Sequence, residues 1–228
     1  MDFLWASVIT AVSLITSFDS EVYKAVWTSL FTSAWATLFA STIGIPFGVA
    51  VTARRFPLKR VAIVVLNTLM ALPTVVVGLV VYGFISRQGP LGGLGLLFTP
   101  MAMIVGQTIL ALPIVSNYTI GAIKGADNRI IPTALTLGAS NFQAYFLLLS
   151  ETRFGIVAAI VAGFGRVIGE VGVAMMLGGN IRGYTRTMTT AIALETSKGE
   201  FAFGLALGMI LMTVALLINI FLNLLQHK

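Results

Sequence analysis

Two ionisable residues, Arg166 and Glu170, lie inside a long apolar stretch that we expect to form a helix over residues 154–178. Each costs about 2.5–3.5 kcal/mol to place near the centre of a bilayer on insertion scales. Because residues four apart share one face of a helix, we expect the two side chains to form an ion pair. The pair could be structural and lock this helix to its neighbours, or it could line a solute pathway or an axis between two copies of the chain.

Two further arginines, Arg182 and Arg186, follow this helix directly. A guanidinium group presents its N–H donors in a planar fork, which suits the binding of oxygen-bearing anions. One interpretation is that these arginines attract an anion to the membrane. The alternative is that they are solvated loop residues or dock an acidic partner, and the sequence leaves both open.

The composition excludes several other kinds of chemistry. The chain has no cysteine, and its single histidine, His227, is next to the last residue. We therefore expect no disulfide, no thiolate or histidine metal cluster, and neither catalytic residue nor cofactor. The sequence has no Gly-Lys pair, so it lacks the G-x-x-x-x-G-K-[ST] phosphate loop and does not bind ATP in that manner.

Membrane helices are the elements predicted to hold these residues. Hydrophobic residues make up 57% of the chain and charged residues 10%, whereas soluble domains carry about 25% charged residues. Four runs contain no charged residue, namely 25–53, 61–86, 88–123 and 201–227. Each run exceeds the roughly 20 residues that a spanning helix needs. We predict five spanning helices, at about 25–52, 61–85, 99–123, 154–178 and 202–225.

The first apolar segment, residues 3–18, is short for a span. It could be a short first span or a helix lying in the membrane interface, and we favour the interface. Asp2 precedes it and no basic residue does, so it does not resemble a cleavable signal peptide. The prolines within the predicted helices, Pro46, Pro73 and Pro113, are expected to produce packing kinks.

Basic residues orient the predicted bundle. With five spans, the 53–60 loop, the 124–153 connection and the C-terminus lie on one side of the membrane. This side holds more lysines and arginines than the other, and the short 53–60 loop alone has Arg54, Arg55, Lys59 and Arg60. The positive-inside rule therefore places it in the cytoplasm. The net charge of +6 does not predict nucleic-acid binding, because the basic residues lie between apolar runs.

Residues 130–150 are free of charge and long enough to span, but they are rich in polar and helix-breaking residues. A span here would leave almost no loop before the 154–178 helix. We therefore predict two short amphipathic helices at the cytoplasmic surface. Pro132 suits the first turn of one helix, and Gly138 suits a tight bend between the two.

The predicted bend resembles a loop of a known family. Permeases of binding-protein-dependent ABC importers have a cytoplasmic loop in which an EAA triplet precedes a glycine. Here Ala134 lies four residues before Gly138, and the run TLGAS at 136–140 is typical of that loop. The sequence departs from the pattern at Pro132, where the family has glutamate, and at Thr133.

The following segment resembles the oxyanion branch of this family, which carries molybdate, sulfate and tungstate. The matching elements are R-x-x-G-E at 166–170, Gly-Asn-Ile at 179–181 and Thr-Arg-Thr at 185–187. Followed by Gly-Glu-Phe at 199–201, they look most like tungstate permeases. The resemblance covers about residues 20–225.

The resemblance implies an all-α, polytopic membrane helical bundle of the ABC-importer permease (MetI-like) type, with one domain over residues 1–228. It implies a multi-pass protein of the cell (inner) membrane that works as a homodimer. Its partners would be two copies of a cytoplasmic ABC ATPase subunit and an external, periplasmic substrate-binding protein. The chain would move an oxyanion inward, tungstate first, with molybdate or sulfate as alternatives. A secondary transporter or channel for a small anion is the rival from composition alone, but such transporters usually show internal repeats and we find none.

The same resemblance assigns ATPase coupling to the cytoplasmic loop within 124–153. A short helix that docks into a groove is recognised through its apolar side chains. The candidates for this contact are Pro132, Thr133, Ala134, Leu135, Leu137, Gly138, Ala139, Ser140, Phe142 and Tyr145. They could instead pack on the underside of the bundle.

Overall fold

A computed structural model of the chain describes residues 2–53 and 58–226. Arg54 and Arg55 of the basic loop, and His227, lie outside these ranges. Within them the chain is helical and has no strand. The helices are α1 Asp2–Thr16, α2 Ser20–Ala53, α3 Lys59–Ala71, α4 Thr74–Ile85, the 3-10 helix η1 Gly92–Leu94, α5 Pro100–Lys124, α6 Ile130–Thr136, α7 Asn141–Glu151, α8 Arg153–Ile168, α9 Gly172–Gly178, α10 Met188–Lys198 and α11 Phe201–Gln226.

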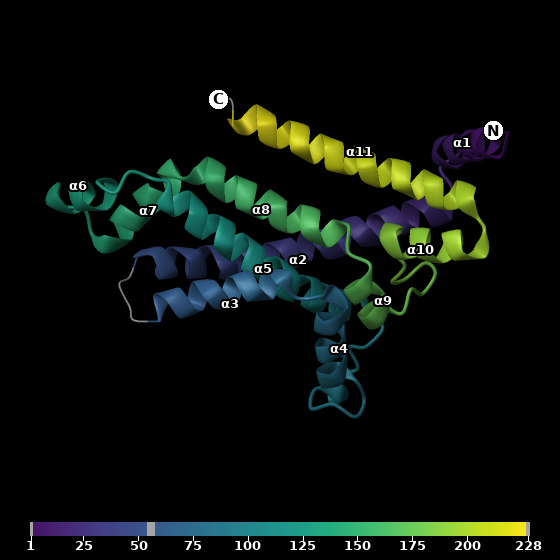
Figure 1. Ribbon diagram of the computed structural model, residues 1–228, viewed down its shortest axis with the longest axis horizontal. Helices are drawn as coiled ribbons and strands as arrows, with labels where there is room; N and C mark the ends of the chain where they lie inside the picture. The colour runs from purple at the N-terminus through teal and green to yellow at the C-terminus, as the bar shows by residue number, and fades with distance from the viewer. Residues whose placement is uncertain (1, 54–57, 227–228) are drawn as a thin grey trace.

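The long helices define the direction in which the bundle would cross a membrane. Helices α2, α3, α5, α8 and α11 run along the long axis of the molecule (Figure 1). Helices α6 and α7 lie at one end with the end of α11, and α1 and α10 lie at the other. The arrangement agrees with the expectation that the 124–153 connection and the C-terminus share a side.

Three helices in the described ranges are long and apolar enough to span by themselves, over Ser20–Thr52, Pro100–Lys124 and Phe201–Phe221. Two bent pairs pass the same test when each is taken together. They are α3 with α4, bent by 99°, and α7 with α8, bent by 70°. The chain therefore has up to five candidate spans, and the all-α polytopic fold class is confirmed.

Close packing around α5 forms the centre of the bundle. A Cβ atom on Gly48 of α2 would lie only 2.9 Å from the Ser116 carbonyl oxygen of α5. On the other side, a Cβ atom on Gly163 of α8 would lie 2.7 Å from Val115 Cγ2. Small residues at membrane helix interfaces let backbones approach closely, and here they fit α2 and α8 against α5.

Side-chain caps explain where several helices begin. Asp19 Oδ1 accepts hydrogen bonds from the backbone N–H groups of Glu21, at 2.9 Å, and Val22, at 3.0 Å, at the start of α2. Thr187 caps α10 in the same way, with Thr190 as its reciprocal partner. Helix α10 is missing from the sequence-based prediction because its polar residues interrupt the apolar pattern.

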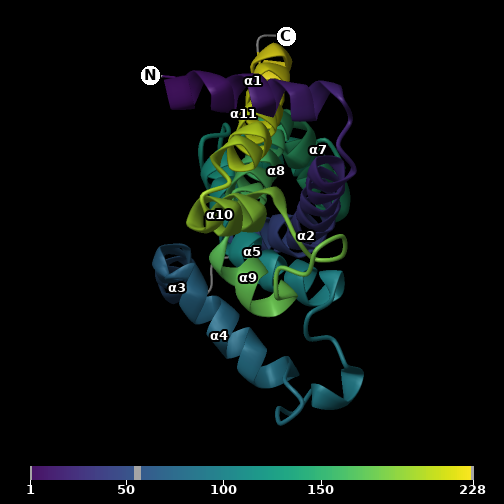
Figure 2. The same ribbon diagram turned by 90° about the vertical axis from the view of Figure 1, so that its right-hand side faces the viewer.

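The predicted helix over 61–85 is wrong as a single rod. It ends at Ala71 and resumes at Thr74 after the 99° bend between α3 and α4. Proline disfavours helical geometry in the residue before it, and Leu72 is extended with ψ 136°. Pro73 therefore breaks this helix instead of kinking it, and α4 projects from the bundle (Figure 2).

Helix α1 lies across the long helices and packs against α11 (Figures 1 and 2). Ser7 and Ala11 face the bundle and are buried, whereas Leu4, Trp5 and Ile9 are exposed. This crosswise orientation is the one expected of a helix that lies in the membrane interface. The interface assignment for residues 3–18 stays a prediction.

The outer face of α2 presents an aromatic row, formed by Trp27, Phe31, Trp35 and Phe39. Successive ring centroids lie 6.3, 6.3 and 5.7 Å apart, and all four side chains are exposed. Such a face suits contact with lipid chains.

Candidate functional site

The predicted ion pair between Arg166 and Glu170 forms at a break between two helices. Arg166 Nη1 donates to Glu170 Oε2 at 2.8 Å. The prediction of one helix over 154–178 is wrong, because α8 ends at Ile168 and α9 begins at Gly172, which leaves Glu170 between them. The Glu170 side chain is 3% exposed and that of Arg166 is 40% exposed. Protein therefore encloses the carboxylate, while the guanidinium keeps one side open.

Glu170 also holds the ends of the broken helix. Its second oxygen, Oε1, accepts a hydrogen bond from the backbone N–H of Val173 in the first turn of α9, at 3.2 Å. Its carbonyl oxygen accepts from Thr189 Oγ1 of α10 at 2.7 Å. A carboxylate is favourable beside the N–H groups that begin a helix. One buried residue thus joins α8, α9 and α10.

The two helix breaks meet in the fold. A Cβ atom on Gly172 would lie 3.0 Å from Thr74 Oγ1, at the start of α4, and 3.3 Å from Glu170 Oε1. Further along, a Cβ atom on Gly78 would lie 3.1 Å from Met176 Sδ. Helix α4 therefore packs directly on α9. A displacement at the break between α3 and α4 would also displace the break between α8 and α9.

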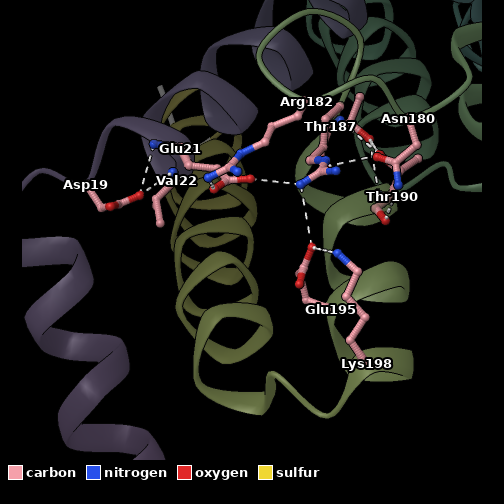
Figure 3. A network of polar contacts seen from close by, with 10 residues as sticks. Asp19, Glu21, Val22, Asn180, Arg182, Thr187, Thr190, Glu195 and Lys198 are labelled. Atoms are coloured by element: carbon pink, nitrogen blue, oxygen red, sulfur yellow. Dashed lines mark hydrogen bonds and ion pairs between the residues drawn. The ribbon is translucent and has the colours of Figure 1, made fainter.

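Arg182 and Arg186 come together around one acidic residue, Glu21 of α2 (Figure 3). Arg182 Nη2 donates to Glu21 Oε2, and Arg186 Nη1 donates to Glu21 Oε1 at 2.8 Å. Arg186 also lies 3.5 Å from Glu195 of α10, which pairs with Lys198 at 3.0 Å. The arrangement ties the start of α2 to α10 and to the loop before it.

This network is balanced in charge. A cavity of about 380 Å³ beside it is lined by three carboxylates and three cationic side chains, together with Phe203. The Arg186 side chain is 11% exposed and that of Arg182 is 72% exposed. Arg186 is therefore enclosed among its acidic partners, whereas Arg182 pairs with Glu21 and still keeps most of its side chain exposed.

Sequence reasoning missed the partners of these arginines. Glu21 is separated from Arg182 by 161 positions, so no local spacing connects them. The scarcity of acidic residues could have indicated these partners. Only eight acidic residues occur in the chain, and three of them line this cavity.

The segment predicted to hold two short helices does so. Pro132 lies in the first turn of α6, and Gly138, with φ +90°, lies between α6 and α7. Only glycine adopts this conformation without strain. Ser140 accepts from the Gln143 backbone N–H at 3.3 Å, and Gln143 Oε1 accepts from the Ser140 N–H at 2.8 Å. This capping box fixes the start of α7 directly after the bend.

The bend between α6 and α7 lies at one end of the molecule (Figure 1). Leu137 is 82% exposed and Phe142 80%, and Leu135 is exposed as well. The other residues predicted to contact the ATPase differ in exposure. Exposed are Pro132, Thr133, Gly138 and Ser140; half-buried are Ala139 and Tyr145; buried is Ala134. Phe146, which the sequence reasoning omitted, is also exposed. Leu135, Leu137, Phe142 and Phe146 therefore form an exposed apolar surface at this end of the molecule.

An exposed ion pair precedes this surface. Arg129 Nη2 lies 3.2 Å from Asp127 Oδ2, and the Arg129 backbone N–H also donates to Asp127 at 2.9 Å. These hydrogen bonds lower the pKa of the Asp127 carboxyl group below its ordinary value. Asp127 therefore stays ionised at neutral pH and holds the turn that leads into α6.

Comparison with known proteins identifies the family. Residues 40–228 match the family described as binding-protein-dependent transport system inner membrane component. The chain belongs to this family. It is thus a permease of the inner membrane with several spans, as predicted, and the recognition made from the Gly138 loop and the 166–187 motifs is confirmed.

Relatives of this permease cover most or all of its length. It is 38% identical over 228 residues to the tungstate uptake system permease protein TupB of Peptoclostridium acidaminophilum, covering 100% of both chains. It is 42% identical over 196 residues to a probable anion ABC transporter permease protein of Haloferax volcanii, covering 84% of each. Its fold is similar to the MetNI methionine ABC transporter in an inward facing conformation, with a TM-score of 0.76 at 20% identity, covering 92% of this chain and 96% of that one.

Proposed function

We propose that this permease imports a tetrahedral oxyanion, most specifically tungstate, and does so as a homodimer. The similarity to a tungstate permease over the whole of both chains supports the substrate class. In this proposal an external binding protein delivers the anion to the end of the bundle that holds α10. That protein would choose between tungstate and the close analogue molybdate.

Energy would come from two copies of a separate ATPase subunit on the cytoplasmic side. The chain has no Gly-Lys pair and hence no phosphate loop of its own. The α6–α7 bend, within the proposed cytoplasmic loop at 124–153, offers Leu137 and Phe142 as exposed apolar contacts. A helix that docks in a groove through such side chains would transmit ATPase movement to α8.

The charged residues take different roles in this proposal. Arg166 keeps an open side on α8 and would face the route of the anion. Glu170 would hold the break between α8 and α9, and Arg186 would hold the outer loop through Glu21. Arg182, the outward arginine, would meet the binding protein or the arriving anion.

The test is reconstitution of the permease with its ATPase and binding protein in lipid vesicles. Adding tungstate should stimulate ATP hydrolysis and produce uptake, with molybdate weaker or equal and sulfate weaker. The permease without the ATPase should give no uptake. Stimulation by none of these oxyanions would contradict the substrate class, and uptake without ATP would favour a secondary transporter or channel.

A further inference from the structure

A cavity lies where the chain turns back from the end of α4 towards the start of α5. Its volume is about 510 Å³, and polar side chains line one part of it, namely Tyr82, Ser86, Arg87 and Gln88. Phe98, two residues before α5, also lines the cavity. Figure 2 shows this turn beyond the end of the projecting α4.

Arg87 brings an unpaired positive charge to this cavity. It is exposed, and its guanidinium makes no ion pair or hydrogen bond with any residue that the structure describes. No aspartate or glutamate occurs in the sequence between Glu21 and Asp127, and none lines the cavity. Arginine beside the apolar part of a membrane is costly unless an anionic group compensates its charge. An anion that balances Arg87 would therefore come from outside the chain.

The cavity lies near one boundary of the membrane. Helix α5 extends about 36 Å from Pro100 to Lys124, slightly more than the roughly 30 Å of hydrocarbon in a bilayer. In the orientation predicted from the sequence, Lys124 is at the cytoplasmic end of α5, so Phe98 is at the outer end. Helix α4 turns 99° away from α3 and exposes the apolar side chains of Val75, Val76, Leu79, Val80 and Phe84. A crosswise apolar helix followed by an arginine suits the level of the lipid headgroups.

An apolar groove begins beside the same turn. Its volume is about 390 Å³, and it is lined by three rings of the aromatic row and by the first residues of α5, namely Phe31, Trp35, Phe39, Pro100, Met101 and Ile104. Pro100 follows Phe98 by two residues, so at most about 7.6 Å of backbone separates the wall of the groove from that of the cavity. A phospholipid is about 20 Å long, half the thickness of a bilayer with its headgroups. One phospholipid can therefore reach both.

We propose that an anionic phospholipid of the outer leaflet binds here, with its phosphate on Arg87 and one acyl chain in the groove between α2 and α5. A guanidinium group pairs with phosphate through its planar fork of N–H donors. A zwitterionic lipid would also bring an ammonium group, for which neither the cavity nor the groove offers a carboxylate. Phosphatidylglycerol should therefore bind better than phosphatidylethanolamine. The bound lipid would join α4 to α2, whichever anion the permease carries.

The first test measures lipid binding to the intact permease by native mass spectrometry. Phosphatidylglycerol and phosphatidylethanolamine with identical chains are added separately to delipidated protein in detergent. We expect the dissociation constant of the first phosphatidylglycerol to be about fivefold lower, the effect of one arginine beside an anionic headgroup. Arg87→Gln should abolish this preference, whereas Arg60→Gln, which removes an exposed arginine near the start of α3, should keep it. Equal constants on the unmodified protein, a preference that survives Arg87→Gln, or one that Arg60→Gln also abolishes would overturn the site.

The second test separates a lipid from a free oxyanion, which Arg87 would also attract. Met101→Trp fills the groove and should weaken phosphatidylglycerol binding by about tenfold, as for the loss of two buried methylene groups. Ile109→Trp, at another exposed position of α5 outside the groove, should not weaken it. Millimolar inorganic phosphate or tungstate should not displace the lipid.

Two results of the second test would overturn the proposal. Displacement of the lipid by either anion would assign the cavity to a free oxyanion. An unaltered affinity in Met101→Trp would remove the acyl chain from the groove. Lipid binding is measured without transport, so a failure of the proposed oxyanion import would leave these results unchanged.

Discussion

Replacing Glu170 with glutamine isolates the charge of the buried carboxylate. Glutamine has nearly the same shape and keeps an oxygen that can accept from the Val173 N–H, at 3.2 Å in the unmodified protein. It removes the negative charge that pairs with Arg166 at 2.8 Å. The change therefore strands one guanidinium group at the break between α8 and α9.

The size of the effect follows from burial on the two sides of the pair. Removing one partner of a fully buried ion pair costs about 3–5 kcal/mol in soluble proteins. Glu170 is 3% exposed, but Arg166 is 40% exposed and can be partly hydrated. We therefore expect the lower end of that range, about 3 kcal/mol of unfolding free energy, or roughly a 100-fold change in the folding equilibrium.

The matched control removes both charges. Arg166→Gln combined with Glu170→Gln leaves two amides and no stranded charge, so the double variant should be more stable than Glu170→Gln alone. The measurement is the fraction of dimer that survives a series of temperatures in detergent, followed by uptake in vesicles. If Arg166 also lines the route, the double variant should assemble well and still transport poorly.

Two results would refute this reasoning. Equal thermal stability of the single and double variants would mean that no charge is stranded, and hence that water reaches the pair freely. Normal uptake by both variants would mean that neither Arg166 nor Glu170 is needed for transport or for the structure of the break between α8 and α9.

Three further predictions concern the ends of the bundle. Gly138→Asp should insert and dimerise but fail to copurify with the ATPase, because it adds a side chain and a negative charge at the bend, where φ is +90°. Gly138→Asn has a side chain of similar size and a similar tolerance of positive φ but no charge, so it should retain more binding. Normal copurification of the Asp variant would contradict the docking surface. Reporter fusions near Asn128 and near Glu151 should both read cytoplasmic, and opposite readings would make 130–150 a span. Glu21→Gln should lower the melting temperature by an amount equivalent to about 1–3 kcal/mol of unfolding free energy. The reason is that Arg186 is only 11% exposed and would keep only its longer contact, with Glu195 at 3.5 Å. An unchanged melting temperature would contradict the structural role of Glu21.

Helix positions could be predicted from this sequence because the charged residues are clustered between long apolar runs. The predicted ends at residue 85 and near residue 123 agree with α4 and α5 within one residue. The bend at Gly138 was also predictable, since glycine, proline and a serine cap are local signals. These features depend on neighbours in the chain.

Features that depend on distant contacts were not predictable in the same way. Apolarity continues through Leu72, so hydropathy gives no sign of the break between α3 and α4. At the break between α8 and α9 the charged residues Arg166 and Glu170 interrupt the apolar run, but an ion pair at this spacing also fits an unbroken helix. Glu21 meets Arg182 across 161 positions, and Asn67 meets Asn117 across 50. Neither pair has a periodic spacing that a single sequence could reveal, so the roles of Arg182 and Arg186 could not be settled without the fold.

The placement of the tryptophans determines what optical spectroscopy can measure on this protein. All three indoles, of Trp5, Trp27 and Trp35, are exposed, by 69%, 69% and 41%. Their fluorescence should respond to the acyl chains around the protein and only weakly to unfolding of its interior. Lipids brominated at chosen carbons quench fluorophores at matching depth. With Trp27 and Trp35 changed to phenylalanine, the best quencher of Trp5 would give the depth of α1, shallow for a helix in the interface and deep for a span.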